Sequence, residues 1–239
     1  MEKIQEKLPK LQSTVVGERL DAMEGVYNAI QADRKNIKSY LSPELFNQLL
    51  TCLKDSFFEI RMMAVAILGW SQDMRAVPPL LESLKDPNDE IRASVATALG
   101  DLGGVNALEA LLTCLKDDAD SVRLIAVRAL GRIASTGTAG ALIESLKDGY
   151  KEVRAEAAKA LGKLNAIKAV DPLLGCLNDR DPTVRLNAIT ALGQLGDQKA
   201  VDSLISALKD REKKVQAEAV RSLKKFKDPR AQQAVQSYH

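Results

Sequence analysis

The chain has 239 residues, of which 46% are apolar, 28% charged and only 4% aromatic, and its net charge is +2. So small a net charge excludes bulk electrostatics as an argument for nucleic-acid or membrane binding. No stretch comes close to the 18 consecutive apolar residues of a membrane-spanning helix. The charged N-terminus, MEKIQEKLPKLQ, is also unlike a secretion signal. We therefore expect a cytoplasmic protein with no membrane partner.

Residues 1–43 are predicted to be a divergent copy of the unit that repeats through the rest of the chain, and to cap its N-terminal end. The segment GERLDAMEGVY, residues 17–27, aligns loosely with the second half of that unit, and Arg19 stands where Arg61 stands in the first regular copy. An extra stretch of about 11 residues, QADRKNIKSYL, then precedes the regular array.

Residues 44–229 are predicted to form six regular copies of a 31-residue unit, because three residue types recur at that period without insertion or deletion. The aspartates are Asp55, Asp86, Asp117, Asp148, Asp179 and Asp210. The arginines are Arg61, Arg92, Arg123, Arg154 and Arg185, followed by Gln216. The glycines are Gly69, Gly100, Gly131, Gly162 and Gly193, followed by Lys224. A fixed period of this length indicates stacked copies of one supersecondary unit rather than a single globular core.

Each copy is predicted to be a helical hairpin, as residues 75–105 illustrate. Pro78 and Pro79 fall in the first turn of a short helix, where a missing N–H costs little. After a polar turn, a second helix carries Ile91 and Leu99 on one apolar face, and a Gly–Gly pair ends it. The predicted fold is therefore all-α, a right-handed α-α superhelix or α-solenoid of about six hairpins.

The recurring residues are expected to serve the fold. Arginine suits multidentate bridging, so the Arg of one copy should reach carboxylates or carbonyls at the turns. A recurring glycine within a helix indicates close helix approach. Cys52, Cys114 and Cys176 occupy one repeat position 62 residues apart. At the roughly 8–10 Å spacing of packed helices they are too distant for a disulfide or a shared metal. They are expected to be small buried core residues.

Residues 230–239 are predicted to close the array with a short helix over AQQAVQSY, residues 231–238. The last full copy has Gln216 and Lys224 in place of arginine and glycine. A terminal repeat has fewer neighbours to bridge or approach, so both substitutions fit a cap. The whole chain is expected to be one continuous solenoid domain.

The pattern L-x-D-x-x-x-x-[IV]-R-x-x-A-x-x-x-L-G resembles the short HEAT-like repeats of the phycobilisome-lyase type. LKDPNDEIR at 84–92 and VRAEAAKALG at 153–162 carry the resemblance, which covers about residues 44–239. It implies that the second helices line a concave face whose outward positions set what is bound. The family includes bilin-attachment factors, enzymes and plain scaffolds, so the resemblance specifies the fold more strongly than the function.

Two groups of residues on these outward positions are candidates for partner binding. The first is apolar: Met62, Met63, Ile67 and Trp70. The second is a basic stripe, Arg128, Arg132, Lys159, Lys163, Arg221 and Lys225, with Leu124 and Ile125 beside it. The alternatives are that the N-terminal copy or its insertion covers the apolar group, and that Glu156 and Glu218 balance the basic stripe on a solvated face.

The sequence offers no catalytic constellation. Its only histidine is His239, the last residue, so Ser–His, Cys–His and paired His–Glu sites cannot be assembled. The predicted function is a non-enzymatic scaffold or adaptor that binds a protein or peptide along the concave face, without a cofactor. The alternatives are a bilin lyase subunit or bilin chaperone acting on a phycobiliprotein, which the resemblance alone implies, and a nucleic-acid-binding protein.

Overall fold

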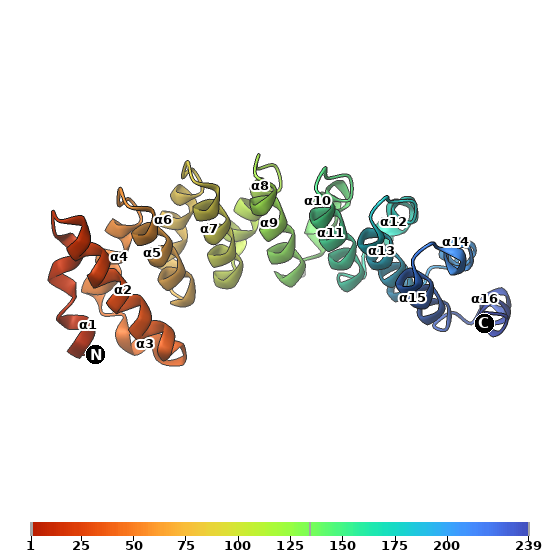
Figure 1. Cartoon of the computed structure of the whole chain (residues 1–239), viewed down its shortest axis with the longest axis horizontal. Helices are drawn as coiled ribbons and strands as arrows, with labels where there is room; N and C mark the ends of the chain where they lie inside the picture. The colour runs from red at the N-terminus through yellow and green to blue at the C-terminus, as the bar shows by residue number, and fades with distance from the viewer. Residues whose placement is uncertain (1, 134, 239) are drawn as a thin grey trace. The chain divides into compact units, whose positions relative to one another are not determined.

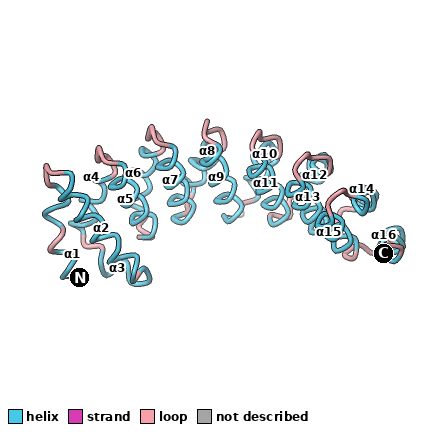
Figure 2. The backbone as a smooth tube through the Cα atoms, in the orientation of Figure 1, coloured by secondary structure: helices cyan, strands magenta, loops and turns pink. Residues whose placement is uncertain are grey.

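The computed structural model describes residues 2–133 and 135–238, and this part of the chain is helical with no β-strand (Figures 1 and 2). The chain divides into two compact units, residues 1–114 and 115–239. Hairpins of a short first helix and a longer second helix, as expected from the 31-residue period, make up both units.

Unit 1 holds the N-terminal copy and the first regular hairpins. Its elements are α1 (Glu2–Gln5), η1 (Leu8–Gln12), α2 (Val16–Ala32), η2 (Arg34–Asn36), α3 (Ile37–Tyr40), α4 (Pro43–Cys52), α5 (Phe58–Trp70), η3 (Met74–Ala76), α6 (Val77–Ser83), α7 (Asp89–Leu102) and α8 (Val105–Cys114). Here α4, α6 and α8 are first helices and α5 and α7 are second helices. Helix α2 packs on α5 as the second helix of the divergent copy.

Unit 2 continues the same alternation. Its elements are α9 (Asp120–Ile133), η4 (Thr136–Thr138), α10 (Ala139–Ser145), α11 (Lys151–Lys163), η5 (Ile167–Ala169), α12 (Val170–Cys176), α13 (Pro182–Leu195), η6 (Gln198–Ala200), α14 (Val201–Ser206), η7 (Ala207–Lys209), α15 (Lys213–Leu223) and α16 (Pro229–Gln236). The second helices α9, α11, α13 and α15 pack side by side in sequence order, and the first helices α10, α12 and α14 pack against them.

Local sequence sets the helix ends. Helix α7 begins after Asn88, whose side-chain oxygen accepts hydrogen bonds from the N–H groups of Glu90 and Ile91. It ends at Gly103, where φ is 73°, a left-handed conformation that glycine adopts without strain. Pro78 lies in the first turn of α6, as the sequence predicts. The two ends of α7 are thus fixed by a capping side chain and by a glycine.

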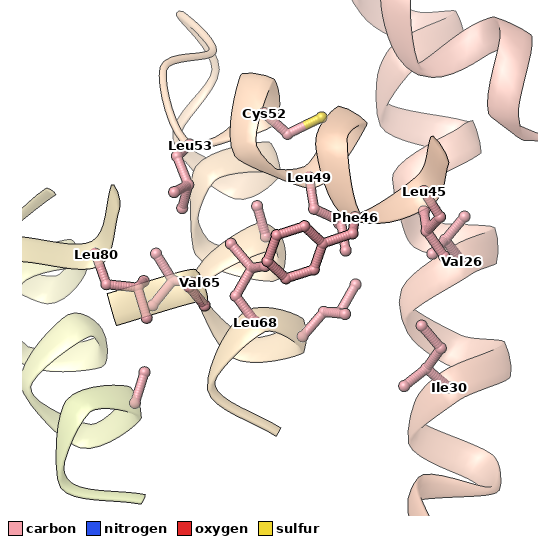
Figure 3. Close-up of a cluster of buried hydrophobic side chains, with 14 of the residues drawn as sticks. Val26, Ile30, Leu45, Phe46, Leu49, Cys52, Leu53, Val65, Leu68 and Leu80 are labelled. Atoms are coloured by element: carbon pink, nitrogen blue, oxygen red, sulfur yellow. The ribbon is translucent and has the colours of Figure 1, made fainter. Parts of the chain in front are cut away.

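The core of unit 1 lies between the first and second helices. Figure 3 shows Val26 and Ile30 of α2 facing Leu45 and Leu49 of α4, with Leu68 of α5 beside them. All of these side chains are fully buried. Burying one such side chain contributes about 1.5–3 kcal/mol, so the N-terminal copy is held to the first regular hairpin by the same apolar packing that joins the other copies.

A ladder of Arg–Asp pairs ties successive copies together within each unit. Arg154 donates from Nε and Nη2 to the carboxylate of Asp179 in the following copy, at 2.8 and 2.9 Å. Its Nη1 donates to the main-chain oxygen of Asp148 in its own turn, at 2.8 Å. The same arrangement joins Arg19 to Asp55, Arg61 to Asp86, Arg123 to Asp148, and Arg185 to Asp210. The predicted bridging by arginine is confirmed, and it uses carboxylates and carbonyls together.

The N-terminal copy takes part in this ladder. Arg19 lies 36 residues before Asp55, whereas the regular pairs are 25 residues apart, and 36 − 25 leaves 11 additional residues. This difference equals the predicted insertion, residues 31–41, which contains η2 and α3. Arg19 is therefore the equivalent of Arg61, as the sequence alignment proposes.

The recurring glycines lie where successive second helices meet. A Cβ on Gly69 would be 2.6 Å from the Cβ of Ala98 on the next second helix, and one on Gly193 would be 2.6 Å from the Cβ of Ser222. No real side chain tolerates such contacts without movement of a helix. The prediction that glycine permits close approach is confirmed, and the partner position is always small in these pairs.

The last copy ends the pattern. Gln216 replaces the ladder arginine and donates to the main-chain oxygen of Asp210, while Tyr238 donates its hydroxyl hydrogen to Gln216 at 2.8 Å. Lys224, in the glycine position, is exposed. Helix α16 follows over Pro229–Gln236. The division into residues 1–43, 44–229 and 230–239, as one continuous domain, stays a prediction.

Candidate binding surface

The solvent-exposed sides of the second helices carry residues that differ between copies. We call these the second-helix face: α5 and α7 in unit 1, and α9, α11, α13 and α15 in unit 2. The ladder aspartates and arginines lie elsewhere, because they pair with each other between the turns. Binding chemistry is therefore sought among the residues that the ladder and the glycine contacts leave to solvent.

In unit 1 the structure corrects one of the four predicted apolar residues. Ile67 was expected on the face but is fully buried. It occupies the repeat position of Ala98, which packs against Gly69 of the preceding second helix. The position thus belongs to the contact between second helices, and the small residues at the equivalent sites were the signal. Met62 and Met63 are half-buried and pack against the core cluster.

The tryptophan of this group is covered by the N-terminal copy. Trp70 is half-buried, and its ring lies 5.3 Å from that of Tyr27 in α2. The guanidinium of Arg34, in the insertion, lies 4.4 Å from the centroid of the Trp70 ring. The alternative in which the N-terminal copy and its insertion cover the apolar group therefore holds at Trp70. An open apolar patch does not exist there.

The basic residues of unit 2 are exposed as predicted, but a carboxylate lies among them. Arg128, Lys159 and Lys163 are exposed, and Leu124 and Ile125 are half-buried. Arg132 is exposed as well. Glu156 contacts two of the cations, with its carboxylate 3.8 Å from Arg128 Nε and 3.1 Å from Lys159 Nζ. The positive charge of the stripe is therefore only partly neutralised. One carboxylate contacts both Arg128 and Lys159, and the Lys163 side chain has no ion-pair partner among the described residues.

The C-terminal part of the stripe has the same composition. Glu218 is buried and pairs with Arg221 at 2.6 Å, and it also accepts a hydrogen bond from the Thr190 hydroxyl at 3.0 Å. Lys225 is exposed, with no partner among the described residues. The predicted balancing by Glu156 and Glu218 is therefore real, and it leaves the stripe with a net positive charge.

A charged hollow of about 190 Å³ lies beside Arg128 and was not predicted from the sequence. Its lining includes Lys151 and Asp181, which pair at 3.1 Å and begin the successive second helices α11 and α13. This hydrogen bond raises the pKa of Lys151. Glu152 also lines the hollow, and its Oε2 has no hydrogen-bond partner. Lys151 and Asp181 are 30 residues apart, which is close to the 31-residue period. This spacing could have indicated that the two side chains lie near each other on successive copies.

Two further grooves lie between first helices. One, of about 690 Å³, is lined in unit 1 by Leu50, Leu53 and Pro79 among others. The other, of about 380 Å³, is lined in unit 2 by Leu174, Leu177 and Ser203 among others. These residues are equivalent in pairs at four times the repeat period. The grooves thus reflect the spacing of successive first helices, and neither brings together groups with catalytic chemistry.

The described residues include no cluster of three or more His, Cys, Asp or Glu side chains that could hold a metal ion. The three cysteines are free and buried, as predicted, and burial raises the pKa of Cys52 and Cys176 to about 11. Among the described residues no helix has the length and apolar character needed to cross a membrane. His239 lies outside the described residues.

The family is established by sequence comparison. A family model of HEAT repeats matches residues 46–125, 113–182 and 170–238, and the chain belongs to this family of helical-repeat proteins. No curated protein sequence matches it.

Solved structures agree on the fold. An engineered protein is 22% identical with a TM-score of 0.61, and the match covers 98% of this chain and 71% of that one. The CpcE–CpcF complex of phycocyanin lyase from Nostoc sp. PCC7120 is 19% identical with a TM-score of 0.55, covering 99% and 94%. Kap95p bound to RanGDP is 17% identical with a TM-score of 0.62, covering 93% of this chain but 36% of that one. At these identities the likeness shows the fold alone.

Proposed function

We propose that the chain is a non-enzymatic scaffold that binds a protein or peptide along its second-helix face. One observation carries the proposal: within unit 2 the recurring arginines pair with the recurring aspartates, whereas the second-helix face displays cations that are incompletely paired. Arg128 and Lys159 share a single carboxylate, and Lys163 has no partner among the described residues. Incompletely paired cations on a regular helical surface suit an acidic protein segment.

The charged and the apolar residues of the second-helix face would contribute differently to binding. Arg128, Arg132, Lys159 and Lys163 would orient an acidic segment and raise its association rate, because exposed charges act mainly through electrostatic steering. Half-buried Leu124 and Ile125, with Met62 and Met63 in unit 1, would supply apolar contacts. Two of the similar structures are themselves complexes of two proteins, CpcE with CpcF and Kap95p with RanGDP. These complexes support the proposal that the partner is a protein, but they do not identify it.

The test is capture of a partner from native lysate, read by mass spectrometry. Wild type is compared with the Trp70→Ala, Arg128→Glu, Lys159→Glu variant and with Lys147→Glu, an exposed lysine in the turn after α10 that is not on the second-helix face. A protein retained by wild type and by Lys147→Glu, and lost by the triple variant, supports the proposal. Equal recovery by all three forms contradicts it and moves the site to the first-helix side or the turns.

The same experiment separates the other assignments. A bilin lyase subunit or chaperone predicts a coloured eluate, and predicts that an added tetrapyrrole quenches the fluorescence of the single tryptophan and shifts its own visible absorbance. A nucleic-acid-binding protein predicts recovery that nuclease treatment abolishes and that moderate salt weakens. Either result without a retained protein would overturn the scaffold proposal.

A further inference from the structure

The side chains around Trp70 form a cation site that the chain itself fills. The Tyr27 and Trp70 rings lie 5.3 Å apart with an interplanar angle of 38°. The Arg34 guanidinium lies over the Trp70 ring, its central carbon 4.4 Å from the ring centroid. A guanidinium within about 6 Å of a tryptophan centroid is in the range of a favourable cation–π contact.

Arg34 is held differently from the ladder arginines. Each ladder arginine takes a carboxylate with two donors, as Arg61 does with Asp86. Within the described residues, the Arg34 side chain has no hydrogen-bond or ion-pair partner, and it is exposed. It lies on η2, a turn of only three residues inside the insertion. A cation–π contact at an exposed site changes an equilibrium by only about two- to fivefold, so a competing cation can replace Arg34.

Tyr27 is present because the N-terminal copy departs from the repeat. It lies eight residues after Arg19, as Gly69 lies eight residues after Arg61. In the regular copies that glycine lets the next second helix approach closely. In the N-terminal copy the Tyr27 ring occupies this glycine position, and it packs against the Trp70 ring. Tyr27 and Arg34 thus both come from the copy that carries the insertion, and both contact Trp70 of the next copy.

One carboxylate of α2 is a neighbour of Tyr27. Glu24 is exposed and precedes Tyr27 by three residues, and side chains at i and i+3 lie next to each other on a helix. A carboxylate beside the aromatic pair favours a positively charged ligand. Unit 1 therefore has a site whose charge preference is opposite to that of the basic stripe of unit 2.

We propose that the Tyr27–Trp70 pair is a docking site for an arginine side chain of the protein partner, and that Arg34 is an intramolecular occupant which that arginine replaces. Arginine is favoured over lysine because its planar guanidinium stacks on an aromatic face, as Arg34 already does. The inference rests on the proposed scaffold function and adds a second chemical requirement to it: a basic side chain at unit 1, beside the acidic segment that unit 2 prefers.

The test uses the full chain and the fluorescence of its only tryptophan. The probe is a capped glycine-rich peptide with two arginines, and the reference peptide has citrulline at both places. We expect saturable quenching by the arginine peptide and little by the citrulline peptide. In Arg34→Ala the dissociation constant should fall about two- to fivefold, because the internal competitor is gone. Lys35→Ala, its exposed neighbour on the same turn, should leave affinity unchanged.

Equal affinity of wild type and Arg34→Ala would overturn the inference, and so would equal binding of the two peptides. Thermal unfolding of each variant confirms that it is folded, and Arg34 is a surface residue whose loss removes no core packing. If the arginine peptide fails while the triple variant still loses its captured protein, the arginine site is wrong and the scaffold stands. If the arginine peptide binds as expected but neither wild type nor any variant captures a protein from lysate, the arginine site stands. The proposal that unit 2 binds an acidic protein segment is then wrong.

Discussion

Arg154 and Asp179, 25 residues apart in sequence, form a two-point ion pair whose side chains are only 9% and 13% exposed. Arg154 Nη1 also donates to two main-chain oxygens of its own turn, those of Asp148 and Gly149. Asp179 in turn accepts a hydrogen bond from the N–H of Asp181. One arginine therefore fixes two turns at once, and the 31-residue period is the distance over which this contact recurs.

Removing the arginine is expected to destabilise unit 2. Arg154→Ala leaves Asp179 partly buried without its cation, and breaking such a pair costs about 3 kcal/mol. Arg154→Lys keeps the charge and loses the two-pronged geometry, so it should recover less than half of that loss. Lys147→Ala, which removes an exposed pair with Glu144, is the control and should change stability by less than about 0.5 kcal/mol. Urea unfolding measures all three, and equal effects would contradict the structural role of the ladder.

The ladder also predicts an acid limit to stability. Burial raises the pKa of the Asp179 carboxyl, but hydrogen bonds from Arg154 and the backbone outweigh it and hold the pKa below its usual value. Hydrogen bonds from Arg185 lower the pKa of Asp210 in the same way. A carboxyl with a lower pKa in the folded state stabilises the fold above its unfolded pKa of about 3.9 and loses that contribution as pH falls through the folded pKa.

The urea midpoint should therefore be nearly constant from pH 7 to 5 and fall below about pH 4. Asp179→Asn should be less stable at pH 7 and should lose less on acidification than wild type, because one of the titrating groups is gone. A midpoint that is unchanged at pH 3 would show that the ladder carboxylates do not contribute to stability.

The glycine contacts predict a steric penalty. Gly69→Ala would place a Cβ 2.6 Å from that of Ala98, and such overpacking typically costs about 1–3 kcal/mol. Gly175→Ala, near the end of α12, meets nothing within 4 Å and should stabilise the chain by up to about 1 kcal/mol through helix propensity. The exchange Gly69→Ala with Ala98→Gly should restore much of the loss. Equal effects of the two alanine substitutions on thermal unfolding would refute the close-approach account.

The cysteines should be inert in the folded protein. Burial raises the pKa of Cys52 and Cys176 to about 11, whereas a free thiol ionises near 8.5, and only the thiolate reacts. Ellman's reagent at pH 8 should detect almost no thiol in the native protein and all three after denaturation. Ser237→Cys, at an exposed site, is the positive control. Rapid reaction of the native wild type would show that these positions open to solvent.

Contacts that recur in successive copies could be predicted from the sequence, whereas contacts that occur only once could not. The Arg19–Asp55 pair followed from alignment with Arg61, because the divergent copy and the first regular copy share the ladder geometry. Ile67 was misplaced because helical spacing alone put it on the face, whereas the small residues at the equivalent positions, such as Ala98, indicate contact between second helices. Arg34 lies in an insertion with no counterpart, so nothing in the period could place it over Trp70.

The basic stripe lies between these cases. Helical spacing predicted that Arg128, Lys159 and Lys163 are exposed, and they are. It also named Glu156 as a balancing charge, but whether one carboxylate neutralises one cation or contacts two depends on side-chain conformation. Residue spacing does not specify side-chain conformation. For the same reason it could not predict that Lys151 pairs with Asp181 across two helices.

The measurement that tests the scaffold claim most directly is the salt dependence of affinity for the captured protein. Wild type, the Arg128→Glu, Lys159→Glu variant and Lys147→Glu are titrated with that protein at several salt concentrations. The account predicts that reversing the two face charges weakens binding at least tenfold at low salt and flattens its salt dependence, while Lys147→Glu behaves as wild type. Unchanged affinity and an unchanged slope in the face variant would contradict binding along the second-helix face.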